Sequence, residues 1–259
     1  MNSKILILMT LYAGSCFGLD LDQARKLSDE ITNIFGAAQI YIFRNQTLIN
    51  SKQPNKNLLF GDEFIAQVKN VHRETYHSPF PVADHPIKAY LLNSMVGVMD
   101  ENRALILDKE IDFKGFIPAG FAFQLSQRFS NGGYSVSIKF VGLKNRLVNE
   151  LNVPDQWETG VLKKMQDSRW SRDQAFREVT ISRQGKFLRT LRPIYHKRQC
   201  LSCHGSIEDN PSNSGKSRET WSAENMAGFT MQNFKLNELA GGVSLSIGFD
   251  VKDRLLRDQ

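Results

Sequence analysis

The chain has 259 residues, 41% of them hydrophobic and 23% charged, which is the balance of a globular protein with a buried core. Its 33 basic and 27 acidic residues give a formal net charge of +6 without a helix that carries a concentrated basic face, so we expect no nucleic-acid partner. Beyond the N-terminus no stretch of about 18 apolar residues occurs, so we expect no transmembrane anchor in the mature chain.

The first 18 residues have the pattern of a secretory signal peptide. Lys4 carries the only charged side chain, Ile5–Tyr12 is an apolar run with one threonine, and small residues follow, among them Ala13 and Gly18. This segment is too short to span a membrane stably, and the alternative is a buried N-terminal helix. We therefore predict export to the periplasm, with a signal peptide at 1–18 and one domain at 19–259.

Cys16 lies close to the predicted cleavage point. Cleavage after Gly18 leaves Cys200 and Cys203 as the only cysteines of the mature chain, with no partner elsewhere for a structural disulfide. Cleavage before Cys16 would instead allow a lipid anchor, although Ala13 occupies a position where lipoprotein signals prefer a larger aliphatic residue. We keep the lipid anchor as the alternative.

Residues 20–130 are predicted to form the helical part of the domain, because apolar residues recur there at three- and four-residue spacing. The segment 40–50 fits either a continued helix or a strand, and 78–86, with three prolines, is predicted as a loop. The predicted helices are 20–36, 62–75, a segment around Leu91–Met99 that ends near Asp100, and one that Pro118 opens and Asn131-Gly132-Gly133 ends.

Residues 131–251 are predicted to be rich in strands, with a fifth helix opening within 152–158 and a polar loop at 207–225. The predicted strands are 134–140, 176–182, 187–195 and 243–249, the middle two joined as a hairpin by the turn at 183–186. Helices followed by mostly antiparallel strands indicate an α+β fold.

The second strand of this hairpin leads into Cys200-Leu-Ser-Cys203-His204, the spacing that attaches a c-type haem. Two thiols add to the two vinyl groups of the haem, and the adjacent histidine supplies the proximal nitrogen to the iron. The composition of the chain predicts about 0.0007 chance occurrences of the motif, so the pattern is specific. Predicted export agrees with it, because c-type haem is attached outside the bacterial inner membrane, and the loop at 207–225 would cover the haem edge.

Two other readings of this motif stay open. A CxxC redox dithiol could be followed by a histidine by accident, which would make the protein a dithiol oxidoreductase. A zinc ion could take His196 together with the two cysteines and His204, but structural zinc sites usually pair two separated ligand clusters, and the sequence has no second CxxC or HxxxH.

The sequence does not identify the sixth ligand of the iron. Two strong protein ligands favour electron transfer, whereas a vacant position allows gas binding or peroxide chemistry. An open or water-bound position is an equal alternative to any protein ligand. For each histidine the alternative is a surface or loop residue, and for Met95 and Met99, which lie on a helical stripe, it is a core residue. The candidates are His72, His77, His85, His196, Met95, Met99, Met226 and Met231.

Haem propionates need cationic or hydrogen-bonding partners, and Arg192 is the candidate that we select from the strand entering the motif. Arg189 and Lys197 flank the same strand, and the alternative for all three is an ordinary solvated strand face. Trp157 is expected to pack in the core. Glu158 belongs to the first turn of a helix, where an acid complements the helix dipole, and we assign it no catalysis.

Several stretches, taken together, resemble an exported c-type haem-binding family of unknown function that has a PAS-like fold and occurs alone or as the sensor part of chemoreceptors and histidine kinases. The resemblance covers about 21–251 and rests on Phe113-Lys-Gly-Phe-Ile-Pro118, Lys144-Asn-Arg146, Asn152-Val-Pro-Asp-Gln-Trp-Glu158, Arg192-Pro-Ile-Tyr195, Cys200-Leu-Ser-Cys-His-Gly205 and Gly241-Gly-Val-Ser-Leu-Ser246.

The resemblance implies an antiparallel sheet flanked by N-terminal helices, with one haem at one side attached through Cys200, Cys203 and His204. The chain departs from the family where Arg146-Leu-Val148 replaces an Arg-Asn-Pro tripeptide and where Ser206-Ile207 lacks a proline. Some relatives also have a cysteine in the N-terminal half that could ligate iron, and this chain has none between Cys16 and Cys200.

Together these observations predict a periplasmic monohaem c-type protein that senses redox state or a small ligand, or that transfers single electrons. No kinase or methyl-accepting segment follows 251, so a redox partner or a membrane-bound signalling partner would have to read its state. The alternative class is a haem enzyme of the peroxidase type, with a base supplied from 72–85.

Overall fold

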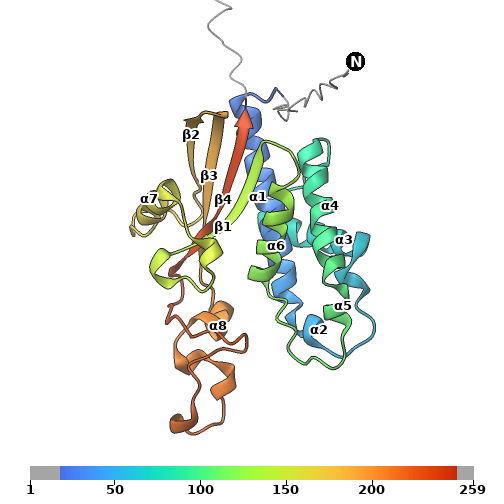
Figure 1. Cartoon of the computed structure of the whole chain (residues 1–259), viewed down its shortest axis with the longest axis vertical. Coiled ribbons are helices and arrows are strands. Elements are labelled where there is room, and N and C mark those ends of the chain that lie inside the picture. The colour runs from blue at the N-terminus through green and yellow to red at the C-terminus, as the bar shows by residue number, and fades with distance from the viewer. Residues whose placement is uncertain (1–17, 250–259) are drawn as a thin grey trace, which may run out of the picture.

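The computed structural model describes residues 18–249, so the predicted signal peptide lies almost wholly outside the described residues. Figure 1 shows helices on one side of a sheet and a lobe of loops and short turns below it. The helices are α1 (Leu21–Arg44), α2 (Gln46–Asn50), α3 (Gly61–Tyr76), α4 (Pro86–Glu101), α5 (Arg103–Leu107), α6 (Pro118–Ser130), α7 (Gln156–Met165) and α8 (Leu201–His204), and the strands are β1 (Val136–Gly142), β2 (Phe176–Ser182), β3 (Gly185–Tyr195) and β4 (Leu239–Phe249).

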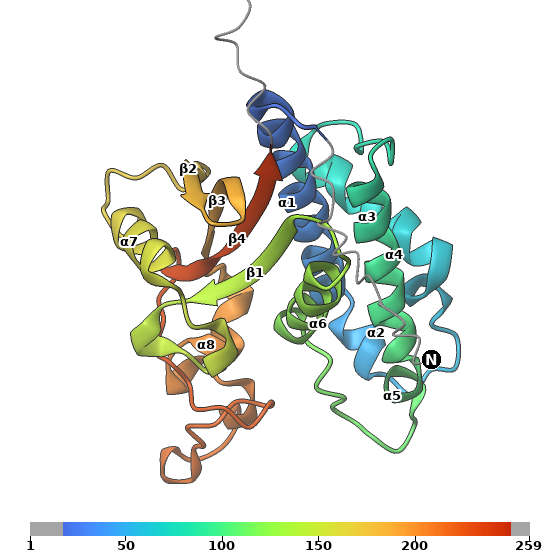
Figure 2. The same ribbon diagram turned by 45° about the horizontal axis from the view of Figure 1, so that its top comes forward.

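The longest helix, α1, lies between the sheet and the helices α3 and α4 (Figure 2). It begins where Asp20 accepts a hydrogen bond from the backbone N–H of Gln23 while the Gln23 side chain accepts one from the backbone of Asp20. The helix continues to Arg44 and α2 follows at once, so the ambiguous segment 40–50 is helical rather than a strand. The apolar residues of 40–44 therefore extend the buried face of α1.

The larger hydrophobic core joins α1, α3, α4 and α6 to the face of the sheet that α1 covers. Pro86 and Pro118 each stand in the first turn of a helix, where the missing N–H of proline costs nothing. Ser28 of α1 donates a hydrogen bond to Thr190 of β3 at 2.8 Å inside this interface. The largest fully buried side chains of this core are Phe35, Phe64, Phe121, Phe129, Ile31, Ile34, Ile42, Ile49, Leu59, Leu91 and Met95.

The sheet has the strand order β1-β4-β3-β2, and every neighbouring pair is antiparallel. Strands β2 and β3 form the predicted hairpin, and β4 is inserted between β1 and β3. Gly241 at the start of β4 has a φ of 150°, and a Cβ atom there would lie 2.1 Å from the carbonyl oxygen of Val141. Only glycine permits β1 to approach β4 this closely at the end of the sheet that faces the lobe.

Helix α7 covers the opposite face of the sheet from α1 and encloses a smaller core. Asp155 and Glu158 form a capping box at its start. The side chain of Glu158 is only 3% exposed and forms ion pairs with Lys139 of β1 at 3.2 Å and Arg189 of β3 at 3.3 Å. The guanidinium of Arg189 also lies 4.1 Å from the ring centre of Trp157. The Trp-Glu stretch thus attaches α7 to the sheet, consistent with a structural role.

A lobe comprising residues 196–238 separates β3 from β4 and lies below the sheet in Figure 1. Besides α8 it has short 3-10 turns and an isolated bridge between Glu224 and Thr230. Within the described chain, Phe234 is the only apolar side chain of this lobe that is buried. The predicted loop at 207–225 is therefore too short, and the irregular region continues to the start of β4.

The predicted α+β fold, an antiparallel sheet flanked by the N-terminal helices, is confirmed. Most strand and helix predictions agree with the structure to within a few residues, but α1 continues to Arg44 instead of ending at Gly36, and α2, α5 and α8 had no separate prediction. No helix between residues 18 and 249 combines the length and the hydropathy that a membrane crossing requires.

Candidate haem-attachment site

The CxxCH motif follows directly from the end of β3. After Tyr195 the chain makes a 3-10 turn, Arg198–Cys200, and then the short helix α8, which ends at His204. Because Cys200 and Cys203 are three residues apart on this continuous helical turn, both thiols lie on the same side of it. Both are free and half-buried. The geometry therefore presents two adjacent nucleophilic sulfurs beside one imidazole.

The orientation of the His204 ring is set by Gln232. The Nδ1 atom of His204 lies 2.6 Å from Oε1 of Gln232, and the Nε2 amide of Gln232 donates to the carbonyl of Thr230 at 2.7 Å. The second bond identifies the atom facing the histidine as the amide oxygen, which can only accept. Nδ1 must then carry the proton, and Nε2 keeps its lone pair for a metal ion.

The segment after this glutamine runs alongside α8 and holds its end in place. Asn233 donates its backbone N–H to the carbonyl of Gly205 at 2.9 Å, and Phe234 donates to the carbonyl of His204 at 2.9 Å. Asn225 donates its side-chain amide to the carbonyl of Cys203, also at 2.9 Å. The carbonyls at the C-terminal end of α8 are thus occupied, which keeps the motif in one conformation.

His196 lies next to His204. Its side chain is 5% exposed, and its ring centre is 5.3 Å from that of His204 and 4.2 Å from that of Phe234. Burial lowers the pKa of His196 to about 4, and His204 and Arg146 act in the same direction. The ring is therefore neutral at ordinary pH, and its buried Nε2 atom has no hydrogen-bond partner in the protein.

Arg146 is a cation that contacts the same aromatic ring as His196. Its guanidinium carbon lies 4.5 Å from the ring centre of Phe234, and Nη1 pairs with Glu238 at 2.6 Å. Arg146 belongs to one of the stretches that carry the family resemblance, but sequence reasoning gave it no role. No local signal could have found it, because it reaches this place from the far end of β1.

Arg192, the sequence candidate for a propionate contact, points toward α1. Its Nη1 atom donates to Asn33 at 2.7 Å, and Nη2 lies 3.9 Å from Asp29. Arg189 is paired with Asp155 and Glu158 near α7, and Lys197 is exposed. A contact between Arg192 and a haem propionate stays a prediction.

The other candidates for the sixth iron ligand are spread over the molecule. His72, His77 and His85 lie on or beside α3 and α4, which Figures 1 and 2 both place across the molecule from α8. Met95 and Met99 are fully buried in the larger core. Met226 is exposed and Met231 is half-buried, both within the lobe. Of all the candidates, His196 alone has a described contact with the ring of His204.

The residues present fit a covalently attached haem better than a zinc ion. Between residues 18 and 249 no group of three or more histidine, cysteine or acidic side chains has an arrangement that could hold a metal ion. Two free thiols on one helical turn and an imidazole with a free Nε2 match instead the three bonds that a c-type haem makes. A CxxC dithiol would use the same two sulfurs but would have no need for the oriented histidine.

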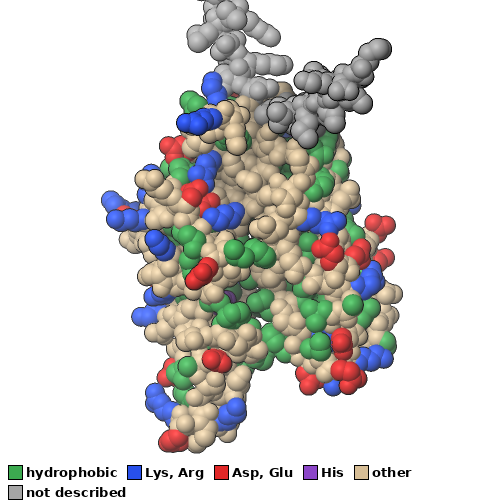
Figure 3. All heavy atoms as spheres, viewed as in Figure 1, with side chains coloured by type: hydrophobic (Ala, Val, Ile, Leu, Met, Phe, Trp, Pro, Cys, Tyr) green, Lys and Arg blue, Asp and Glu red, His purple; other side chains and the backbone are tan. Residues whose placement is uncertain are grey.

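Figure 3 shows the surface hollowed between the lobe and the helical side, with hydrophobic side chains around the hollow and histidine visible inside it.

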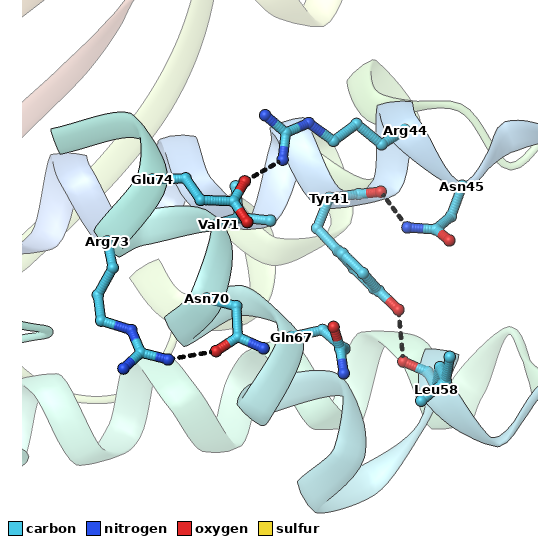
Figure 4. A pocket seen from close by; sticks show the side chains of 9 residues that line it. All are labelled: Tyr41, Arg44, Asn45, Leu58, Gln67, Asn70, Val71, Arg73 and Glu74. Atoms are coloured by element: carbon cyan, nitrogen blue, oxygen red, sulfur yellow. Dashed lines mark hydrogen bonds and ion pairs between the residues drawn. The ribbon is translucent and has the colours of Figure 1, made fainter. Parts of the chain in front are cut away.

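A separate depression of about 550 Å³ lies between α1 and α3. Figure 4 shows Tyr41 there donating to the carbonyl of Leu58 at 2.8 Å and Arg44 paired with Glu74 at 2.7 Å. No residue of the CxxCH motif lines that depression, so we place the candidate site in the hollow beside the lobe.

A family model named Tll0287-like matches residues 23–248, which is most of the chain. The chain belongs to the Tll0287-like family. This confirms the family resemblance drawn from the motifs. Among solved structures, the chain is similar to the "Crystal structure of the cyanobacterial heme-protein Tll0287", with 19% sequence identity, 63% of this chain and 96% of that chain covered, and a TM-score of 0.36. No curated protein matches the chain significantly.

Proposed function

We propose that this member of the Tll0287-like family is a periplasmic protein that binds one haem covalently and serves in redox or small-ligand sensing, or in single-electron transfer. The observation that carries the proposal is the His204–Gln232 contact at 2.6 Å beside two free thiols. A histidine whose Nδ1–H is held by an acceptor is oriented to give Nε2 to a metal. Membership of the family supports the proposal, since Tll0287 itself is a cyanobacterial heme-protein.

In the proposed site, Cys200 and Cys203 would hold the haem through two thioether bonds, each made by adding one S–H across one vinyl group, which needs no external oxidant. His204 would supply a nitrogen to the iron, and its contact with Gln232 keeps the ring from rotating. The bound iron would supply one-electron redox chemistry or an axial position for a small ligand.

The lobe and the helical side would together limit access of water to the group. Asn225 and the 232–234 segment hold the proximal side through the backbone bonds described above. We propose that a redox partner or a membrane-bound signalling partner reads the state of the iron.

The test is an optical spectrum of the protein expressed with a cytochrome c maturation system. We expect a Soret band that survives acid-acetone extraction in the wild type and in Ser202→Ala, a matched control on the same turn. The double variant Cys200→Ser/Cys203→Ser should lose covalently retained haem. Wild-type protein without retained haem would contradict the proposal and favour the dithiol oxidoreductase.

The response of the same haem-loaded protein to carbon monoxide distinguishes electron transfer or redox sensing from sensing of a small ligand. A reduced spectrum that carbon monoxide leaves unchanged means a strong sixth ligand and favours electron transfer or redox sensing. A shift on carbon monoxide means a vacant or weakly held position and favours sensing of a small ligand. Turnover of hydrogen peroxide by that second form would identify the peroxidase alternative.

A further inference from the structure

The side chain of His196 has a feature that the haem attachment described above leaves unexplained. Its Nε2 atom is buried and has no partner, although leaving a buried polar atom unpaired costs about 1–3 kcal/mol. The backbone on either side is fixed, because His196 donates its N–H to Glu238 at 2.9 Å and accepts from Asn237 at 2.8 Å. The backbone position of His196 is therefore fixed, and its ring packs between those of His204 and Phe234.

In the arrangement that the structure shows, the ring of His196 is too close to that of His204 for both to bind one iron from opposite faces. Two imidazoles on opposite faces of one iron need ring centres about 6 Å apart, since each metal–nitrogen bond is about 2 Å and each ring centre lies about 1 Å further. The rings of His196 and His204 are 5.3 Å apart, and Phe234 packs 4.2 Å from His196. The two histidines are thus neighbours on one side of a common site rather than opposing ligands.

A cation contacts the same aromatic ring as His196. Arg146 and His196 both contact the ring of Phe234. The guanidinium of Arg146 donates from Nη1 to one carboxylate oxygen of Glu238, and its other N–H groups remain as donors. An imidazole N–H and a guanidinium fork placed together are the donors that a carboxylate prefers. A haem anchored by its vinyl edge at Cys200 and Cys203 carries two such carboxylates on its opposite edge.

We propose that Arg146 and His196 together receive a haem propionate, with Nε2 of His196 and the guanidinium of Arg146 as the donors. The proposal rests on covalent haem attachment at Cys200, Cys203 and His204. It moves the propionate contact from Arg192, whose guanidinium faces Asn33 of α1, to a residue that follows β1. It also explains why a neutral histidine is kept buried beside the proximal ligand.

The test uses the haem-loaded protein and two observables, the propionate bending band in the resonance Raman spectrum and the midpoint potential. We expect His196→Phe, which keeps an aromatic ring against Phe234, and Arg146→Met to move the band to lower frequency. Arg146→Met should also lower the potential, because a positive charge near the haem favours the reduced iron. Arg146→Lys should restore most of the potential, since it keeps the charge.

Arg218→Met is the matched control, because Arg218 lies in the same lobe and its side chain is 78% exposed. Bands unchanged in both His196→Phe and Arg146→Met would overturn the proposal, as would a band that moves only in Arg192→Met. Carbon monoxide binding gained only in His196→Phe would make His196 the sixth ligand instead. Wild-type protein with no covalent haem would overturn the haem attachment itself, a result distinct from unchanged bands. If His196→Phe fails to fold, the comparison of Arg146→Met with Arg146→Lys still tests the propionate contact.

Discussion

At the scale of single residues, the histidines of this chain differ by their surroundings. His72 is buried in α3 between the rings of Tyr76 and Phe80, at 5.1 Å and 5.2 Å, whereas His77 ends the same helix and is exposed. Burial lowers the pKa of His72, and the backbone of Ser78 acts in the opposite direction. Within its aromatic surroundings the neutral ring is favoured over the charged one.

This burial makes the stability of the protein depend on pH. The folded-state pKa of His72 lies below the ordinary value of about 6.5, so the unfolded state binds the proton more readily. The contribution of His72 is complete above about pH 6.5 and is lost as the pH falls through the folded pKa. We expect His72→Phe to lose less free energy of unfolding between about pH 7 and pH 5 than the wild type does, as measured by urea denaturation.

His77→Gln serves as the control for this measurement. Because His77 is exposed, its replacement should leave the pH dependence unchanged, apart from a constant offset. Parallel pH profiles for His72→Phe and the wild type would contradict the role assigned to burial. The comparison is a difference between variants, so the other titrating groups of the chain cancel.

At the scale of elements, a buried lysine joins the short helices at one end of the helical part. Lys56 is 2% exposed, and its Nζ atom donates to the carbonyls of Ile49 at 2.9 Å, Ser51 at 2.7 Å and Ile106 at 2.6 Å. These carbonyls belong to α2, the turn after it and α5. One ammonium group thus satisfies the C-terminal carbonyls of two helices that have almost no intrahelical bonds of their own.

We expect Lys56→Met to lower the free energy of unfolding by at least about 2 kcal/mol, because three buried carbonyls lose their donor. The measurement is chemical denaturation of the purified protein. Lys52→Met is the control: Lys52 is 61% exposed and pairs with Asp112, itself 84% exposed, so its loss should cost under about 1 kcal/mol. Equal effects of the two substitutions would show that the three hydrogen bonds do not stabilise this end.

At the scale of the whole molecule, the helices and the sheet share cores that the lobe mostly lacks. Of the described side chains at 196–238, Phe234 alone is apolar and buried, and the rest of the lobe is held by hydrogen bonds. Regions with few buried apolar contacts open more easily than the cores around them. Without a covalently bound group, the lobe should therefore be the least protected part of the folded chain.

Hydrogen exchange measures this difference. In Cys200→Ser/Cys203→Ser, amides at 206–231 should exchange much faster than those of α1, β3 and β4, and haem attachment in the wild type should slow them, since a group bound only by the folded state stabilises it. Amides of α3 are the internal control and should exchange alike in both proteins. Equal protection of the lobe in both forms would mean that it folds independently of the haem.

Much of this architecture followed from local signals. Pro118 at the start of α6, the Asn131-Gly132-Gly133 stretch that ends it, and the alternating residues of β1 and β4 act over a few neighbouring positions, so these elements could be predicted. The segment 40–50 could not, because its apolar spacing fits a helix and a strand equally. Its helical form was decided by the core against which α1 packs, and α5 was decided by contacts such as that of Lys56.

For the candidate site, the sequence predicts Cys200, Cys203 and His204, because covalent attachment of a haem requires that spacing within one turn. Only the tertiary structure brought Gln232 to His204, and Arg146 to the ring of Phe234 beside His196. These partners come from separate segments that meet at the lower end of the sheet. Spacing along a chain fixes neighbours on one turn, whereas hydrogen-bond partners across the molecule depend on how the elements pack.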